Sequence, residues 1–139
     1  MTRLFALVLA LALAAPSPSV AQGGPDPDFA RYLFPPDLVM RYQQRIALRP
    51  EQREAITSAI QQLQSRTIEQ QWRMQEETQK LGELLRATPV NEAAVLAQVD
   101  RVLGIEREVK RAHMTMLVRV KNTLTREQQA ALRALRDST

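Results

Sequence analysis

Two long runs of apolar residues, spaced alternately four and three apart, constrain the fold of this chain more than any other feature. The first run covers about 50–86 and the second about 92–122, and Thr88-Pro89-Val90-Asn91 is the one clear break between them. Such spacing is typical of a helix that packs against another helix along one face. Because a short connection between long helices makes them antiparallel, the sequence predicts an all-α fold built on a long antiparallel helical hairpin.

The packed face of each predicted helix contains polar as well as apolar residues. The spaced positions of the first helix are Ile56, Ile60, Leu63, Thr67, Gln70, Met74, Glu77, Leu81 and Leu84. Those of the second helix are Val95, Val99, Val102, Glu106, Val109, His113, Met116 and Val120. With the turn centred in the break, Met74 lies opposite Gly104, which has no side chain. We therefore expect Gly104 to let Met74 or Trp72 approach its backbone closely.

Two short helices are expected at the open end of the hairpin. Asp37 is a suitable N-cap for the first, which is predicted to end near Ala47, before the long helix starts. The last helix follows Leu124 and is expected to pack back across the base of the hairpin, near the first short helix. At the central break, Thr88 and Asn91 are both suitable N-caps, and the sequence does not choose between them.

A pentapeptide occurs in two versions, one before the first long helix and one before the last helix. The later copy reads Leu124-Thr125-Arg126-Glu127-Gln128, and the earlier, imperfect copy reads Leu48-Arg49-Pro50-Glu51-Gln52. In the later copy, Thr125 and Gln128 are predicted to form a capping box. In the earlier copy Arg49 has no acceptor oxygen, so Pro50 at the first helical position is expected to start the helix instead.

The paired pentapeptides resemble the motif of the LTXXQ family of periplasmic proteins, over roughly 33–135 of this helical chain. That family includes the chaperone-like stress proteins Spy and CpxP and, as relatives, the heavy-metal sensor or resistance proteins CnrX and ZraP. The resemblance implies an ATP-independent chaperone or envelope-stress adaptor whose dimer forms a cradle. The residues that carry over directly are Leu48, Gln52, Leu124, Thr125 and Gln128, and their expected role is architectural.

The first residues of the chain are typical of a signal peptide. Arg3 precedes an apolar run over 4–15, which is shorter than the about 20 residues of a membrane-spanning helix, and Ser19-Val20-Ala21 supplies small residues for a signal peptidase. We expect a signal peptide over 1–21, cleaved after Ala21, and a periplasmic location; an uncleaved anchor is the alternative. The mature chain is then expected to have a flexible arm over 22–36 and a single LTXXQ-type helical domain over 37–137.

Large apolar and aromatic side chains gather at the end of the predicted arm. They are Phe29, Tyr32, Leu33 and Phe34. In one interpretation they pack over the end of the helical body. In the other they stay exposed and hold a partner subunit or a client, since exposed apolar patches usually mark interaction sites.

The sequence offers little for catalysis or for a metal centre. There is one His and no Cys, and no glycine-rich phosphate loop, so we expect no enzyme activity and no cofactor. His113 is a weak metal candidate, with Met114, Met116 and Glu106 as its only helpers, because tight transition-metal sites recruit three or four ligands. The metal-binding relatives have several His residues, and this difference counts against metal sensing here.

The charge pattern and the small predicted core indicate which binding partners to expect. Acidic and basic residues are interleaved, with pairs four apart such as Glu69 with Arg73 and Glu106 with Lys110, which is typical of a solvated surface and not of a nucleic-acid site. A two-helix core with 4% aromatic residues is marginal by itself. We therefore expect a homodimer in which paired hairpins cover each other, and no binding to nucleic acid.

Three functions remain open from the sequence. The favoured one is binding of unfolded or misfolded periplasmic polypeptides through weak apolar and charged contacts. The alternative is a periplasmic heavy-metal sensor or resistance protein, with a membrane-bound sensor protein as a further partner. A purely structural dimeric module is the third. The first predicts suppression of aggregation without metal, the second a metal-dependent change through His113, and the third neither.

Overall fold

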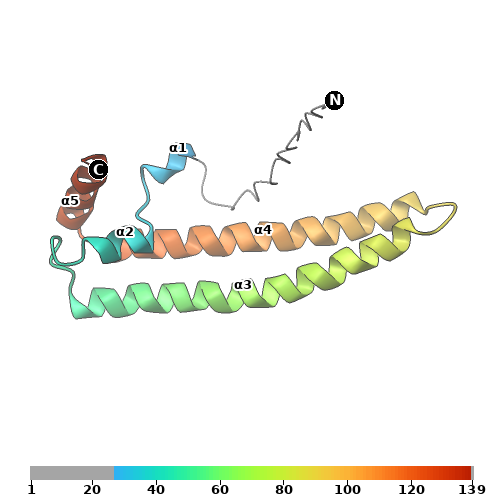
Figure 1. The fold of residues 1–139 in the computed structure, drawn as a ribbon, viewed down its shortest axis with the longest axis horizontal. Helices are drawn as coiled ribbons and strands as arrows, with labels where there is room; N and C mark the ends of the chain where they lie inside the picture. The colour runs from blue at the N-terminus through green and yellow to red at the C-terminus, as the bar shows by residue number, and fades with distance from the viewer. Residues whose placement is uncertain (1–26, 139) are drawn as a thin grey trace, which may run out of the picture.

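The computed structural model describes residues 27–138. Its helices are α1 (Pro27–Ala30), α2 (Pro36–Arg41), α3 (Pro50–Leu85), α4 (Glu92–Thr123) and α5 (Arg126–Asp137). Figure 1 shows α3 and α4 running side by side along the length of the molecule, with α2 and α5 at the end where α3 begins and α4 ends. No strand occurs among the residues that the structure describes, so the predicted all-α hairpin with short flanking helices is confirmed.

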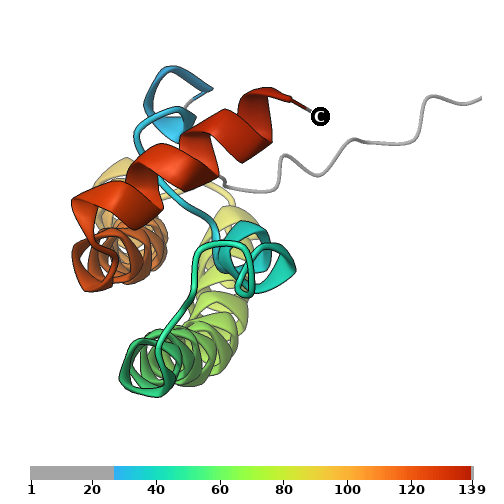
Figure 2. The same cartoon turned by 90° about the vertical axis from the view of Figure 1, so that its left-hand side faces the viewer.

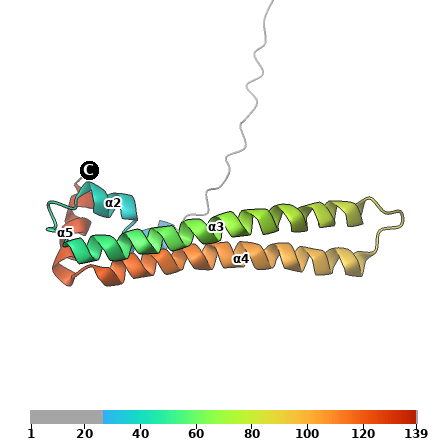
Figure 3. The same ribbon diagram turned by 90° about the horizontal axis from the view of Figure 1, so that it is seen from below.

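Side chains that cross the hairpin fix the pairing of its two helices. The Gln70 amide donates a hydrogen bond of 2.9 Å to the Glu108 carboxylate. The Gln98 amide donates bonds of 2.8 Å and 2.6 Å to the carbonyl and the carboxylate of Glu77. Each contact joins residues at similar chain distances from the α3–α4 connection, as expected for the antiparallel neighbours seen from below in Figure 3.

The helix faces that were predicted to pack are largely the ones that do. All spaced positions on α3 are buried or half-buried, and so are those on α4 apart from Glu106, which is exposed. Ile105, which is 2% exposed, takes that place, three residues after Val102 and four before Val109. The prediction for Glu106 is wrong because an isoleucine gains by burial, whereas a carboxylate loses its hydration there.

Gly104 does not serve a close approach between the helices. Nothing lies within 4 Å of the position that a Cβ atom would take at this residue. Trp72 is 70% exposed, so its indole is not packed against the backbone of α4. The prediction that Gly104 admits Met74 or Trp72 is therefore wrong.

The main apolar core lies at the open end of the hairpin, where the short helices gather (Figure 2). Its largest fully buried side chains are Phe34, Val39, Leu117, Val120 and Leu132. Fully burying one such side chain is worth about 1.5–3 kcal/mol. Toward the α3–α4 connection the buried residues are Gln70, Gln98 and Ile105. Most of the apolar stabilisation is thus concentrated at one end, and the other end is a thin helix pair.

Some helices start as the sequence predicts, and others do not. Asn91, and not Thr88, caps α4, because its side-chain oxygen accepts from the backbone N–H of Ala94 at 3.0 Å. α2 begins at Pro36 without a side-chain cap, so Asp37 lies inside its first turn. The predicted cap at Asp37 is wrong because a proline ring already fixes the φ angle that a first helical residue needs.

α2 also ends earlier than predicted. The helix stops at Arg41, and the chain turns over 42–47 before α3 begins. Ala47 has a φ of 48°, which is the left-handed region. The predicted helix as far as Ala47 is wrong, because a residue in that region cannot continue a right-handed helix.

The N-terminal segment is packed where it meets α2. The predicted arm over 22–36 contains α1, and its residues Leu33 and Phe34 are buried in the core. The predicted signal peptide over 1–21, its cleavage site and residues 22–26 lie outside the described residues. Within 27–138, no helix combines the length and the apolar character needed to cross a bilayer.

Candidate functional site

The two pentapeptides meet at the base of the hairpin through their glutamines. The Gln52 amide donates to Gln128 Oε1 at 2.8 Å, and the Gln128 amide donates back to Gln52 Oε1 at 2.9 Å. Both side chains are buried, and Leu48 and Leu124 of the same pentapeptides pack in the adjacent core. The pair therefore joins the first turn of α3 to the first turn of α5.

The remaining hydrogen bonds of Gln52 hold its surroundings. Its amide nitrogen also donates to the Thr123 carbonyl at 2.8 Å, and its oxygen accepts from the Arg49 N–H at 3.1 Å. The Arg49 side chain has no acceptor, so only the glutamine half of a capping box is present at α3. Pro50 stands at the first helical position there, as the sequence predicts.

Gln128 completes the full capping box that was predicted at α5. Its backbone N–H donates to Thr125 Oγ1 at 3.1 Å, and its side-chain oxygen accepts from the Thr125 N–H at 2.9 Å. Its amide nitrogen also donates to the Ile46 carbonyl at 3.2 Å. A primary amide has two donor hydrogens and two acceptor lone pairs, so both Gln52 and Gln128 use their full capacity. In this structure both side chains hold distant segments of the fold together.

The four residues at the end of the predicted arm do not form one surface. Leu33 and Phe34 are 7% and 0% exposed and belong to the core. Phe29 and Tyr32 are 56% and 53% exposed. Packing over the helical body therefore applies to Leu33 and Phe34, whereas Phe29 and Tyr32 are available for contacts.

Arg136 of α5 holds this segment in place. Its guanidinium donates to the carbonyls of Ala30 and Leu33, each at 3.3 Å, and to that of Arg31 at 2.9 Å. A cation at these carbonyls complements the partial negative charge at the end of α1. The exposed ring of Tyr32 is thus presented from an anchored backbone.

His113 lies half-buried on the packed face of α4. Its predicted helpers are dispersed: Met116 is 6% exposed in the core, Met114 is 37% exposed, and Glu106 is exposed. Among residues 27–138 no three or more His, Cys, Asp or Glu side chains form a group that could hold a metal ion.

A row of exposed apolar side chains runs along α4. Leu96, Leu103, Met114 and Val118 are 55%, 48%, 37% and 42% exposed. Their intervals of seven, eleven and four residues place them on one side of a helix with about 3.6 residues per turn. We call these four residues the outer stripe.

The outward side of α3 also carries large apolar groups. Ile68 and Trp72, four residues apart, are 58% and 70% exposed. The sequence did not lead us to expect that Ile68 and Trp72 or the outer stripe form exposed apolar rows, because the predicted spacing covered only the face that packs within the hairpin. Their signal was present as a second set of apolar residues at helical spacing, off that face.

One ion pair across the hairpin takes the place of a pair predicted along α3. Arg73 pairs with Glu108 on the opposite helix at 2.9 Å, and not with Glu69. The predicted pair of Glu106 with Lys110 is likewise not among the ion pairs of the described residues.

Glu77 is held in its charged form by polar neighbours. The hydrogen bond from the Gln98 amide, followed by that from Lys80 at 3.0 Å, lowers the pKa of Glu77 below its ordinary value. Lys80 donates to Glu76 at 2.7 Å and to Glu77, and these bonds raise the pKa of Lys80. The charges stabilise each other on the thin part of the hairpin.

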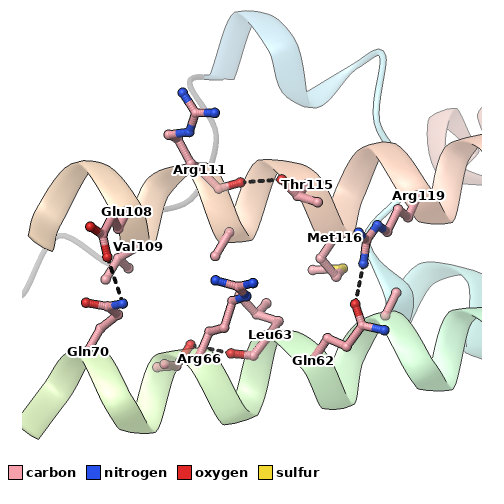
Figure 4. Close-up of a pocket in the computed structure, with 13 residues that line it drawn as sticks. Gln62, Leu63, Arg66, Gln70, Glu108, Val109, Arg111, Thr115, Met116 and Arg119 are labelled. Carbon is pink, nitrogen blue, oxygen red and sulfur yellow. Dashed lines mark hydrogen bonds between the residues drawn. The ribbon is translucent and has the colours of Figure 1, made fainter.

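A hollow of about 290 Å³ opens between α3 and α4. Figure 4 shows it spanned by Arg66 from α3 and bordered by Arg119 from α4. Ala112 also lines it, and at about 3.6 residues per turn this residue projects nearly opposite to Met114 of the outer stripe. The hollow and the outer stripe are therefore separate surfaces.

A known protein family matches nearly the whole chain. A family model for heavy-metal resistance proteins matches residues 3–137. The chain belongs to the heavy-metal resistance family. This family is part of the helical group that includes Spy, CnrX and ZraP. The resemblance inferred from the pentapeptides is therefore confirmed for this wider group. No curated protein and no solved structure matches the chain.

Membership of the heavy-metal resistance family fits a chaperone-like role and a metal-linked role equally. The difference between the two roles must therefore lie in the surfaces of this family member. It presents separated apolar groups on the outside of the hairpin, and its one histidine lies on the packed face of α4.

Proposed function

We propose that this heavy-metal resistance family member binds unfolded or misfolded polypeptides in the periplasm, without ATP and without an enzymatic step. The observation that carries the proposal is the outer stripe on α4, where large apolar side chains are exposed to water along one side of a helix. Burying such a side chain is worth about 1.5–3 kcal/mol, and exposed apolar surface of this kind usually marks an interaction site.

The surroundings of the outer stripe suit extended chains of varied sequence. The exposed charges of Asp100, Arg107 and Lys110 lie along the same helix, so apolar contacts alternate with charges of both signs. A binding surface of separate weak contacts tolerates many sequences, whereas a deep pocket selects one ligand. Phe29 and Tyr32 add two further exposed aromatic rings near the open end of the hairpin.

The test is light scattering of a chemically denatured client that is diluted into buffer containing a chelator. We expect the wild-type protein to suppress aggregation at a near-stoichiometric ratio. The variant Leu103→Gln/Met114→Gln should suppress less, since it removes the two central apolar groups of the stripe. Val90→Gln is the matched control, because Val90 is 45% exposed but lies in the α3–α4 connection. No suppression by the wild type, or equal suppression by the stripe variant, would count against the proposal.

We also propose a homodimer. Toward the α3–α4 connection the hairpin is a thin helix pair, and a second copy would cover apolar surface that one copy leaves exposed there. Light scattering at micromolar concentration measures the mass directly, and a stable monomer would contradict this. Trp72 is the single tryptophan of the chain and is 70% exposed in one copy. Quenching of its fluorescence by acrylamide therefore reports whether a partner copy covers the outward side of α3.

A periplasmic heavy-metal sensor or resistance protein is the second candidate function, and membership of the heavy-metal resistance family is compatible with it. It would act through His113 and, as a further proposal, signal to a membrane-bound sensor protein. Replacing the chelator by zinc or copper in the same assay, and measuring thermal unfolding in parallel, tests it. A metal-dependent shift that His113→Ala abolishes would support this function, and its absence would leave the polypeptide-binding proposal alone.

A further inference from the structure

We propose that the hollow between α3 and α4 binds an amphiphilic anion of the medium-chain fatty acid class. The carboxylate would lie against the arginines at the rim, and the alkyl chain would lie along the apolar floor. This site is independent of the proposed polypeptide-binding surface, because it opens on the other side of α4 from the outer stripe.

Apolar residues from both helices form part of the lining of the hollow, which we call its floor, and Gln62, Thr67, Gln70 and Thr115 add polar groups beside them. Its apolar residues are Ala59, Leu63, Val109, Ala112 and Met116. The two alanines, one from each helix, leave space between the larger side chains. The volume of about 290 Å³ is at the lower end of the range of small-molecule sites, which suits a narrow alkyl chain better than a ring system.

The rim of the hollow carries an excess of positive charge. Arg66, Arg111 and Arg119 line it, together with a single carboxylate, that of Glu108. Figure 4 shows the Arg66 side chain reaching into the space between the helices and Arg119 meeting the side chain of Gln62, with which it forms a hydrogen bond. The guanidinium of Arg111 points away from this space in the same view.

The arginines nearest the floor have charge available for a ligand. Glu108 is occupied by Arg73 and by the Gln70 amide, each at 2.9 Å. Neither Arg66 nor Arg119 takes part in an ion pair within residues 27–138. Guanidinium groups form strong, directional hydrogen bonds to carboxylates, so these two are the expected ligands of the acidic head.

Only a ligand with both parts uses the whole site. An inorganic anion would satisfy the arginines and leave the floor in water, and a neutral alcohol would cover the floor and leave the arginines unpaired. A carboxylate on an alkyl chain makes both contacts at once. The structure therefore predicts that head and chain contribute together to affinity.

Isothermal titration of the purified wild-type chain with decanoate, below its micelle concentration, tests the site. We expect one decanoate per chain, bound at least about tenfold more tightly than acetate, inorganic phosphate or decanol. Arg66→Gln and Arg119→Gln should each weaken binding by about tenfold, which is the loss typical of one charge-assisted hydrogen bond. Arg107→Gln is the matched control, since Arg107 is exposed on α4 away from the hollow and should bind as the wild type does.

Each contrary result overturns the proposal in a recognisable way. If acetate or phosphate binds as tightly as decanoate, the apolar floor does not contribute to affinity. If decanol binds as tightly as decanoate, the arginines do not contribute. If Arg107→Gln weakens binding as much as Arg66→Gln, only net charge matters. If Leu103→Gln/Met114→Gln loses decanoate while the arginine variants keep it, the ligand lies on the outer stripe. Aggregation suppression by Arg66→Gln should equal that of the wild type, so failure of this site and of the polypeptide-binding proposal are distinguishable.

Discussion

Replacing Gln128 by leucine removes one half of the buried amide pair and should weaken the fold strongly. The variant leaves four hydrogen-bonding groups without their partner. These are the Thr125 N–H, the Ile46 carbonyl, and one donor and one acceptor position of Gln52. Gln52 is 3% exposed, so water cannot easily replace the lost bonds.

The expected loss follows from the number of bonds. At about 1 kcal/mol net for each hydrogen bond, four bonds correspond to about 4 kcal/mol. That is a large part of the about 5–15 kcal/mol by which a domain is usually stable. Leucine is of similar size, so the variant creates little cavity and the loss reports the polar contacts.

Urea unfolding followed by circular dichroism, at one fixed protein concentration, measures this free energy. Gln75→Leu is the matched control, because Gln75 is exposed on α3 and its replacement should change stability by less than about 0.5 kcal/mol. The double variant Gln52→Leu/Gln128→Leu removes both partners, so it should cost less than the two single variants together. A loss below about 1 kcal/mol for Gln128→Leu, or strict additivity in the double variant, would refute the reasoning.

Three further perturbations separate core, backbone and electrostatic effects. Phe34→Ala should lower the free energy of unfolding by about 3–5 kcal/mol, since Phe34 is fully buried, whereas Phe29→Ala should change it by less than about 0.5 kcal/mol; equal thermal melts of the two variants would contradict this. Ala47→Gly should raise the midpoint of thermal unfolding, because relief of a left-handed alanine is worth about 1 kcal/mol, and a lower midpoint would argue against strain at this residue. Gln98→Leu should raise the pKa of Glu77 toward its ordinary value, as measured by NMR titration. Because a lowered carboxyl pKa stabilises the fold above the unfolded pKa and loses that effect as pH falls through the folded pKa, the stability difference caused by Gln98→Leu should shrink in acid; an unchanged Glu77 pKa would mean that Gln98 does not control it.

Local chemistry along the chain was enough to predict the two long helices, the last helix and much of their packed faces, whereas α1 lies in the segment expected to be a flexible arm. The alternating spacing predicted α3 and α4, and nearly all of the positions that it assigned to the packed faces are buried or half-buried, but it omitted Gln98, Ile105 and Leu117. The capping box of Thr125 with Gln128 acts over three residues, and so the sequence predicts it directly. Where several local signals competed, as at Asp37 beside Pro36, the local prediction was wrong.

The functional surfaces depend on contacts between distant segments. The sequence placed Phe29 and Phe34 in one group, but only the packing of the arm against α4 and α5 buries one and leaves the other in water. It likewise matched Arg73 with Glu69 on its own helix, whereas the opposite helix supplies Glu108.

The sequence by itself determined an all-α hairpin and the capping box that starts α5, because helical periodicity and capping act over about four residues. The tertiary structure decided which apolar residues remain exposed, which arginines border the hollow, and that Gln52 meets Gln128. These features require the register and orientation of helices that are remote in the chain, and the energy of each contact depends on whether neighbours exclude water from it.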